Sequence, residues 1–247
     1  MAQKGTRVTE RTQTRQHQEA ASGKLTAAPA LPAKTAKPGL HQLGLARGRD
    51  ALLYVPATYR PAEPAPFALA LHGAGSDARN GLVPLLDLAD HAGLIVLAPA
   101  SRDRTWDSIL GGFGPDVAFL DQALAATFDQ CNVDPRRLAI SGFSDGASYA
   151  LSLGITNGLL FTHILAFSPG FVAPAAQRDH PLVYISHGTR DRVLSIDACS
   201  RRIVPMLRHA GYEVIYHEFD GPHTVPPEIA QEAVTWLTTG RTPAGGA

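Results

Sequence analysis

The chain has 247 residues, which is ample for one domain with a sizeable core and short for two typical domains. Hydrophobic residues make up 45% and charged residues 18%, as in ordinary globular enzymes. Lysine plus arginine equals aspartate plus glutamate, 22 of each, and no run of about 18 apolar residues occurs, so we expect no nucleic-acid partner and no integral membrane segment.

The N-terminal part is rich in Thr, Gln, Arg, Ala and Pro and lacks the apolar run of a secretory signal. Such a composition buries too little apolar surface to offset its ordering entropy. We therefore expect a flexible tail over residues 1–38, a folded domain over residues 39–240, and a flexible C-terminal end over residues 241–247. A basic, Thr-rich transit peptide is the alternative interpretation of the tail. The expected location is cytoplasmic.

After the tail, short apolar runs alternate with helical patterns. Ala51–Val55 and Phe67–Leu71 are predicted strands, joined by a spacer that carries four prolines. Gly81–Ala92 has helical spacing, with Leu82, Leu85, Leu86 and Ala89 on one face. Leu94–Ala98 is a continuous apolar run, as expected for a strand buried on both faces.

The same alternation continues to the C-terminus. Further helices are predicted over Asp116–Cys131, Ala147–Leu153, Ser195–Ala210 and Pro227–Thr238. Further strands are predicted over Arg137–Ile140, Thr162–Phe167, Leu182–Ser186 and Glu213–Phe219. This order predicts a single-domain α/β fold with a mainly parallel sheet and helices on both faces. No insertion is long enough for a separate lid domain.

The strongest chemical signal is Gly142-Phe143-Ser144-Asp145-Gly146, a G-x-S-x-G sequence. The string alone is weak evidence, but a predicted strand precedes it and a predicted helix follows it. This setting holds a serine in a sharp turn with its hydroxyl exposed. The helix N-terminus also places positive dipole beside any developing anion. Ser144 is therefore the candidate nucleophile.

A serine hydroxyl needs a base and an acid, which follow in the order Ser, acid, His in such folds. His223 lies in a turn between the last strand and the last helix, and we expect it to be the base. Asp191 follows the strand Leu182–Ser186, and we expect its carboxylate to orient the imidazole. Asp197 is the main rival acid. His187 and Asp220 are expected to have structural roles.

A tetrahedral intermediate also needs hydrogen-bond donors for its oxyanion. Leu71-His72-Gly73-Ala74-Gly75 follows a predicted strand and resembles the His-Gly oxyanion loop of esterases. We expect the backbone N–H groups of Ala74 and Asp145 to form this hole, and His72 to be a scaffold residue.

Together these segments resemble the phospholipase/carboxylesterase family of α/β-hydrolases. The matching pieces are LHGAGSDARN, LAISGFSDGASYAL, AFSPGF, HGTRDRVL and FDGPHTVP, spread over about residues 50–240. The resemblance implies carboxylesterase activity, often on short acyl chains and sometimes on thioesters or lysophospholipids. Common members carry Gln-Gly-Gly after the serine, whereas this chain has Asp145-Gly146-Ala147, so a particular substrate does not carry over. Polyester depolymerases and feruloyl esterases have the same arrangement of motifs, so these two activities remain alternatives.

We expect a serine hydrolase that cleaves small or short-chain carboxylic esters through an acyl-enzyme, without a metal or an organic cofactor, as a monomer or a homodimer. Trp106, Phe113, Phe143 and Val193 are candidate residues of the substrate pocket. Cys131 and Cys199 have no metal-ligand spacing, and reduced structural thiols are the favoured interpretation. A catalytically silent domain that binds a ligand or partner is the alternative from another class.

Overall fold

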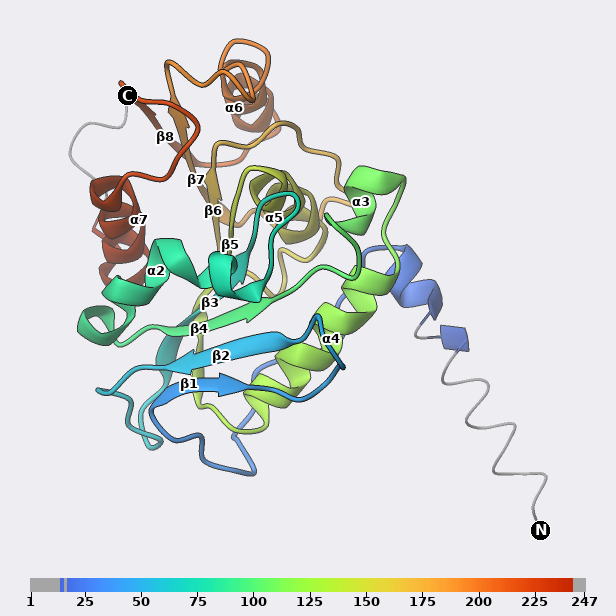
Figure 1. Ribbon diagram of the computed structural model, residues 1–247, viewed down its shortest axis with the longest axis vertical. Helices are drawn as coiled ribbons and strands as arrows, with labels where there is room; N and C mark the ends of the chain where they lie inside the picture. Colours follow the sequence, from blue (N-terminus) through green and yellow to red (C-terminus); the bar gives the residue numbers. More distant parts are fainter. Residues whose placement is uncertain (1–13, 16, 242–247) are drawn as a thin grey trace.

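The computed structural model of the chain describes residues 14–15 and 17–241, and Figure 1 shows one α/β domain built on a single twisted sheet. The strands are β1 (Gly39–Gln42), β2 (Ala51–Val55), β3 (Ala65–Leu71), β4 (Ile95–Pro99), β5 (Val133–Phe143), β6 (His163–Phe167), β7 (Leu182–Gly188) and β8 (Val214–Phe219). The helices are α2 (Ala78–Ala92), α3 (Asp107–Leu110), α4 (Pro115–Phe128), α5 (Asp145–Thr156), α6 (Ser200–His209) and α7 (Pro227–Thr239).

The eight strands lie in the order β1-β2-β4-β3-β5-β6-β7-β8. Every pair from β4 to β8 is parallel, whereas β1 and β2 join the β4 edge in antiparallel orientation. The predicted mainly parallel sheet is confirmed. Parallel strands place their carboxyl ends at one edge, and in open α/β sheets this edge carries the ligand site.

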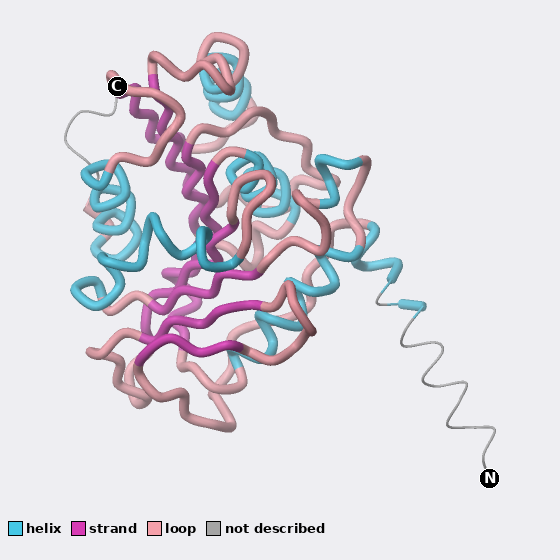
Figure 2. The backbone as a smooth tube through the Cα atoms, viewed as in Figure 1, coloured by secondary structure: helices cyan, strands magenta, loops and turns pink. Residues whose placement is uncertain are grey.

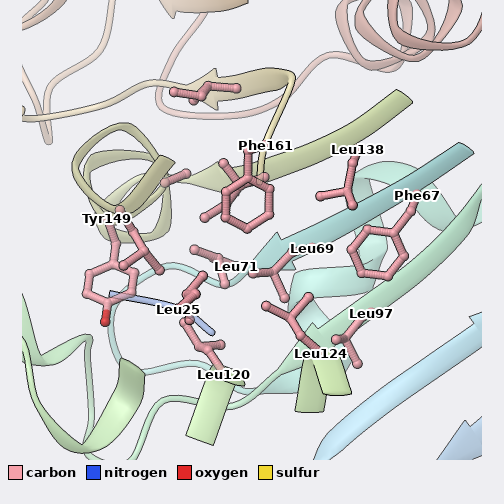
Figure 3. Packing of buried hydrophobic residues seen from close by; sticks show 14 of the residues in the cluster. Leu25, Phe67, Leu69, Leu71, Leu97, Leu120, Leu124, Leu138, Tyr149 and Phe161 are labelled. Carbon is pink, nitrogen blue, oxygen red and sulfur yellow. The ribbon is translucent and has the colours of Figure 1, made fainter. Parts of the chain in front are cut away.

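Helices cover both faces of the sheet, as Figures 1 and 2 show. Helices α2 and α7 pack on one face, and α4, α5 and α6 pack on the other. The strands β3 and β4 are buried along their whole length, which explains why their sequences are apolar without alternation. Figure 3 shows the core beneath α4 and α5, where Phe67 and Leu69 of β3 meet Leu124 of α4.

The prediction of a flexible tail over residues 1–38 is wrong for residues 20–36, which pack against the domain. Ala20, Leu25 and Ala36 are at most 7% exposed and belong to the core cluster beneath α4 and α5, and Figure 3 places Leu25 beside Leu120 and Tyr149. We call residues 20–36 the N-terminal strap. A few buried side chains suffice to fix this Ala- and Pro-rich strap because hydrogen bonds also fix its backbone. Residues 1–13 and 242–247 of the expected flexible ends lie outside the described residues.

Side chains of the domain supply these hydrogen bonds. The Asn157 side chain accepts from the Leu25 amide at 2.9 Å and donates to the Gly23 carbonyl at 2.8 Å. The Asp121 carboxylate accepts from the Thr26 amide at 2.7 Å. The strap is therefore part of the folded domain, which begins before residue 39.

Two short elements were not predicted from the sequence. Strand β1 is a four-residue edge strand with alternating half-buried and exposed positions, so it has no apolar run. Helix α3 is a single turn inside a glycine-rich loop. Helix α6 begins at Ser200 rather than at the predicted Ser195. The residues before it form turns, in which the amides of Ala198 and Cys199 donate hydrogen bonds to the Ser195 carbonyl. Within the described ranges, no helix has the length and apolar character to cross a membrane.

Candidate active site

Ser144 lies in the sharp turn between β5 and α5, at the carboxyl edge of the sheet. Its backbone has φ 58° and ψ −121°, a left-handed conformation that costs free energy for a residue with a side chain. The Ser144 amide donates to the Phe167 carbonyl of β6 at 3.0 Å, which fixes the turn on the neighbouring strand. The turn therefore presents the hydroxyl away from the sheet.

The two glycines of the motif are required by close backbone approach. A Cβ on Gly142 would lie 2.2 Å from the Gly146 carbonyl oxygen, and a Cβ on Gly146 would lie 2.4 Å from the Leu71 carbonyl oxygen. No side chain fits at either position, because real Cβ contacts are much longer. The second contact packs the start of α5 directly against the end of β3, where the Gly73–Ala74 loop begins.

His223 and Asp191 converge on the Ser144 hydroxyl. The His223 Nε2 lies 2.9 Å from the Ser144 Oγ, and the His223 Nδ1 lies 2.5 Å from the Asp191 Oδ2. Because the carboxylate only accepts, the Nδ1 carries the proton and the Nε2 is free to accept from the hydroxyl. The structure thus brings together the three residues that the sequence predicts.

The Asp191 carboxylate is held by donors on both oxygens. Its Oδ1 accepts from the amides of Val193 and Leu194, each at 2.8 Å. Its Oδ2 accepts from His223 and also lies 3.2 Å from the Nε2 of His187. Burial opposes ionisation of Asp191, but the bonds from Leu194, His223 and Val193 outweigh it and hold the pKa of the carboxyl below its ordinary value. Asp191 is therefore charged at neutral pH.

His187 is fully buried behind Asp191. Its Nε2 donates to the Leu194 carbonyl at 2.8 Å, and its Nδ1 lies 2.6 Å from the Ser200 hydroxyl, which donates to it. Burial lowers the pKa of His187, so the ring is neutral. The expected structural role is consistent with these contacts, which in addition reach the carboxylate of Asp191.

The two predicted oxyanion donors are the backbone amides of Ala74 and Asp145. The Asp145 amide is the first in α5, where the positive end of the helix dipole lies. Among the described residues, neither the Asp145 amide nor the Ala74 amide donates a hydrogen bond. The Asp145 side chain turns aside and accepts from the Thr105 hydroxyl at 2.6 Å. Both predicted donors are therefore free to donate to another group, and their role in an oxyanion hole stays a prediction.

The loop that carries Ala74 is fixed from below by His72. This ring is buried; its Nδ1 donates to the Gly73 carbonyl at 2.7 Å, and its Nε2 accepts from the Ser101 amide at 3.0 Å. Burial lowers the pKa of His72 and keeps the ring neutral, which this pair of bonds requires. The loop ends at Gly75, which has φ 70° and whose amide donates a hydrogen bond to the Arg104 carbonyl. His72 has the scaffold contacts that the sequence analysis expects.

The four candidate pocket residues have different positions. A cavity of about 560 Å³ opens beside His223 between α2 and α7, and Phe143 lines it. Trp106 does not line this cavity: it is fully buried, stacks on Tyr149, and donates from its Nε1 to the His72 carbonyl. Phe113 lines a separate hollow of about 490 Å³ and covers Gly23 of the strap. Val193 is 69% exposed and touches the site only through its amide.

The rival carboxylates lie elsewhere. Asp197 is exposed in the turn before α6 and pairs with Arg201 at 2.7 Å. Asp220 is exposed and pairs with Arg190 at 2.9 Å. Sequence reasoning did not find Thr105, because a single hydroxyl in an irregular loop carries no motif. No three His, Cys, Asp or Glu side chains are grouped to hold a metal in the part of the chain that the structure describes.

Comparisons with known proteins relate the chain to esterases. No protein-family model matches it. Feruloyl esterase C of Emericella nidulans is 27% identical over 167 residues, which is 64% of this chain and 60% of that protein. The bifunctional acetylxylan esterase/xylanase XynS20E of Neocallimastix patriciarum is 31% identical over 157 residues, which is 60% of this chain and 22% of that protein. The chain thus spans less than two thirds of the length of these relatives.

Solved structures agree on the fold. The crystal structure of esterase PE8 superposes with a TM-score of 0.62 at 24% identity, over 75% of this chain and 95% of that chain. The chain has the α/β-hydrolase fold and is similar in sequence to proteins named as esterases.

Proposed function

We propose that the protein is a serine hydrolase that cleaves small carboxylic esters through an acyl-enzyme on Ser144. The observation that carries this proposal is the continuous chain of contacts from the Asp191 carboxylate through His223 to the Ser144 hydroxyl, at 2.5 Å and 2.9 Å. A hydroxyl with an imidazole at hydrogen-bond distance, oriented by a buried carboxylate, is the arrangement that activates serine. The similarity to proteins named as feruloyl and acetylxylan esterases supports it.

The mechanism follows from these contacts. His223 takes the proton of Ser144 as the oxygen attacks the ester carbonyl carbon. The amides of Ala74 and Asp145 then donate to the oxyanion. The carbon–oxygen bond of the ester breaks, the leaving oxygen takes the proton from His223 Nε2, and the alcohol departs. Water repeats the steps on the acyl group and restores Ser144, while Asp191 holds the imidazole in one tautomer.

A fluorophosphonate probe tests the proposal, because it labels only an activated serine. We expect the full chain to be labelled and Ser144→Ala to lose all labelling. The matched control is Ser195→Ala, which changes an exposed serine in the turn before α6 and should leave labelling unchanged. A wild-type protein that stays unlabelled while folded would favour the silent binding domain and overturn the proposal.

The class of ester is a finer part of the proposal. Acetate and butyrate esters are the expected substrates, and feruloyl, polyester, thioester and lysophospholipid hydrolysis are the alternatives. Initial rates on p-nitrophenyl acetate, methyl ferulate, an acyl thioester and a lysophospholipid rank them. A value of kcat/KM that is highest for the thioester or the lysophospholipid would contradict an ester hydrolase of small substrates.

We also propose that the protein acts in the cytoplasm and that one chain holds a complete site. Cys131 and Cys199 are both buried and free, and burial raises the pKa of the Cys131 thiol to about 12, which suits structural thiols in a reducing compartment. The triad and both oxyanion amides belong to the same chain, so a monomer and a homodimer can both be active. Fractionation of cells that produce the protein tests the location.

A further inference from the structure

The cavity between α2 and α7 lies beside the reacting groups. On that side it is lined by His223, by Phe143 next to the nucleophile, and by Gly73 and Ala74 of the oxyanion loop. Its walls are formed by α2 and by the start of α7, which pack against each other on the same face of the sheet. Its volume of about 560 Å³ lies within the range of small-molecule sites, roughly 300–1,000 Å³.

The position of His223 decides which part of an ester this cavity can take. In the acylation step the leaving oxygen must face the Nε2 of His223, because that atom supplies its proton. The group attached to this oxygen therefore lies on the His223 side of the serine. The Phe143 ring lies tilted against the His223 ring with centroids 4.6 Å apart, so it borders the site on this side of the serine.

We propose that the cavity between α2 and α7 is the binding site for the alcohol part of the ester, and that this part is an apolar group of aromatic size; the inference rests on the proposed function. The acyl part then lies on the other side of Ser144, toward Asp145 and Thr105. The step itself is unchanged: the ester carbon–oxygen bond breaks, the carbon stays on Ser144, and the oxygen leaves with the His223 proton as an alcohol in the cavity.

The lining supports an apolar occupant. Its deep part consists of Leu71, Leu85, Phe143 and Phe167, of which all except Phe143 are nearly or fully buried. A group of aromatic size that covers these side chains gains about 25 cal/mol for each Å² of apolar surface removed from water. Of the polar residues in the lining, Asn80 and Thr224 are exposed, whereas His72 and Ser141 are buried. An alcohol with an apolar ring and a polar outer end fits this lining.

Val83 offers a way to fill the cavity without disturbing the core. It lies on α2 with 65% of its surface exposed, and it lines the cavity. We expect Val83→Trp to occupy the mouth while the helix and the triad stay intact. The matched control is Leu159→Trp, which places the same side chain at an exposed apolar position after α5, outside this cavity.

The experiment compares two series of esters on the full chain. The first keeps acetate and enlarges a primary alcohol from ethyl to benzyl to 2-naphthylmethyl. The second keeps ethanol and enlarges the acyl group from acetate to hexanoate. We expect the wild-type kcat/KM to rise along the alcohol series. We expect Val83→Trp to lower the ratio of kcat/KM for 2-naphthylmethyl acetate to kcat/KM for ethyl acetate at least tenfold, and Leu159→Trp to keep the wild-type ratio.

The outcomes separate the two proposals. Hydrolysis of ethyl acetate, with no selective loss in Val83→Trp, overturns the alcohol site and leaves the esterase intact. A selective loss along the acyl series instead shows that the cavity holds the acyl group, which also overturns the inference. No hydrolysis of any ester by the wild type overturns the proposed function and the inference with it. Because ethyl acetate is measured on the same preparation, a misfolded variant is recognised and replaced by Val83→Phe.

Discussion

The indole Nε1 of Trp106 donates a hydrogen bond to the carbonyl oxygen of His72, 2.8 Å away and fully buried. The two rings also lie against each other, with centroids 4.8 Å apart. Since His72 immediately precedes the Gly73–Ala74 turn, Trp106 fixes the backbone from which the Ala74 amide is presented. An aromatic residue in an irregular loop thus positions an oxyanion donor without touching the substrate.

Trp106→Phe should therefore reduce turnover rather than substrate binding. The change keeps a ring in the stack but leaves the His72 carbonyl unpaired in a buried place, which costs about 1–3 kcal/mol. We expect kcat to fall roughly three- to tenfold with KM little changed. Trp236→Phe, the same change on α7 at a residue that does not line the cavity, should alter only stability. A rise in KM at constant kcat would show that Trp106 contacts substrate instead.

The contact between His187 and Asp191 predicts a second effect on turnover. His187→Leu removes an N–H group from beside the Asp191 Oδ2 and leaves the Ser200 hydroxyl without its acceptor. We expect kcat to fall by about tenfold, because a less firmly held carboxylate orients His223 less well. His187→Gln can place an amide N–H in the same region and should recover most of the loss. Equal losses in both variants would mean that the ring packs there without positioning the acid.

His163 predicts how stability depends on pH. Burial lowers the pKa of this ring from its ordinary value of 6.5 to about 4, so the folded protein resists a proton that the unfolded chain accepts. Its contribution is present above pH 6.5 and is lost as pH falls toward 4. Between pH 7 and pH 4.5 we expect the wild type to lose about 2–3 kcal/mol more unfolding free energy than His163→Phe.

Urea unfolding of both proteins at the two pH values measures this difference. Phenylalanine keeps the edge contact with Trp236, whose ring centroid lies 4.8 Å from that of His163, and does not titrate. His91→Gln, at an exposed position on α2, controls for the loss of a histidine. Parallel losses in the wild type and His163→Phe would contradict the prediction.

The strap predicts a local effect at Asn157. Asn157→Ala removes the acceptor of the Leu25 amide and the donor to the Gly23 carbonyl, and both groups are then unpaired at a buried place. We expect about 2 kcal/mol of destabilisation, most of it local to residues 20–36. Limited trypsin digestion should cut after Lys24 and Lys34 faster than in the wild type. Unchanged cutting rates would show that the apolar contacts of Leu25 hold the strap without Asn157.

The features that sequence reasoning predicted share a physical cause. Ser144 could be placed because its motif requires a strand before it and a helix after it, and His223 and Asp191 because the carboxyl ends of parallel strands meet at one edge. The strands were found where both faces are buried, since burial forces an unbroken apolar run. Each of these inferences depends on a strong local constraint.

The features that it missed depend on contacts between distant segments. Leu25 lies in an Ala- and Pro-rich stretch and is recognisable as a core residue only beside α4 and α5. Trp106 was expected in the substrate pocket because its loop lies at the right edge, but the direction of its side chain is decided by the carbonyl of His72. The cavity beside His223 depends on how α2 and α7 meet, which no single segment specifies.

The position at which the N-terminal strap docks also constrains the order of folding. Leu25 and Gly23 are bonded to a side chain more than 130 residues later, so these bonds span over half of the chain. During synthesis the strap leaves the ribosome early, whereas α5 emerges much later. The strap therefore cannot dock until Asn157 has emerged and α5 has formed, so its docking depends on contacts between segments that are far apart in the chain.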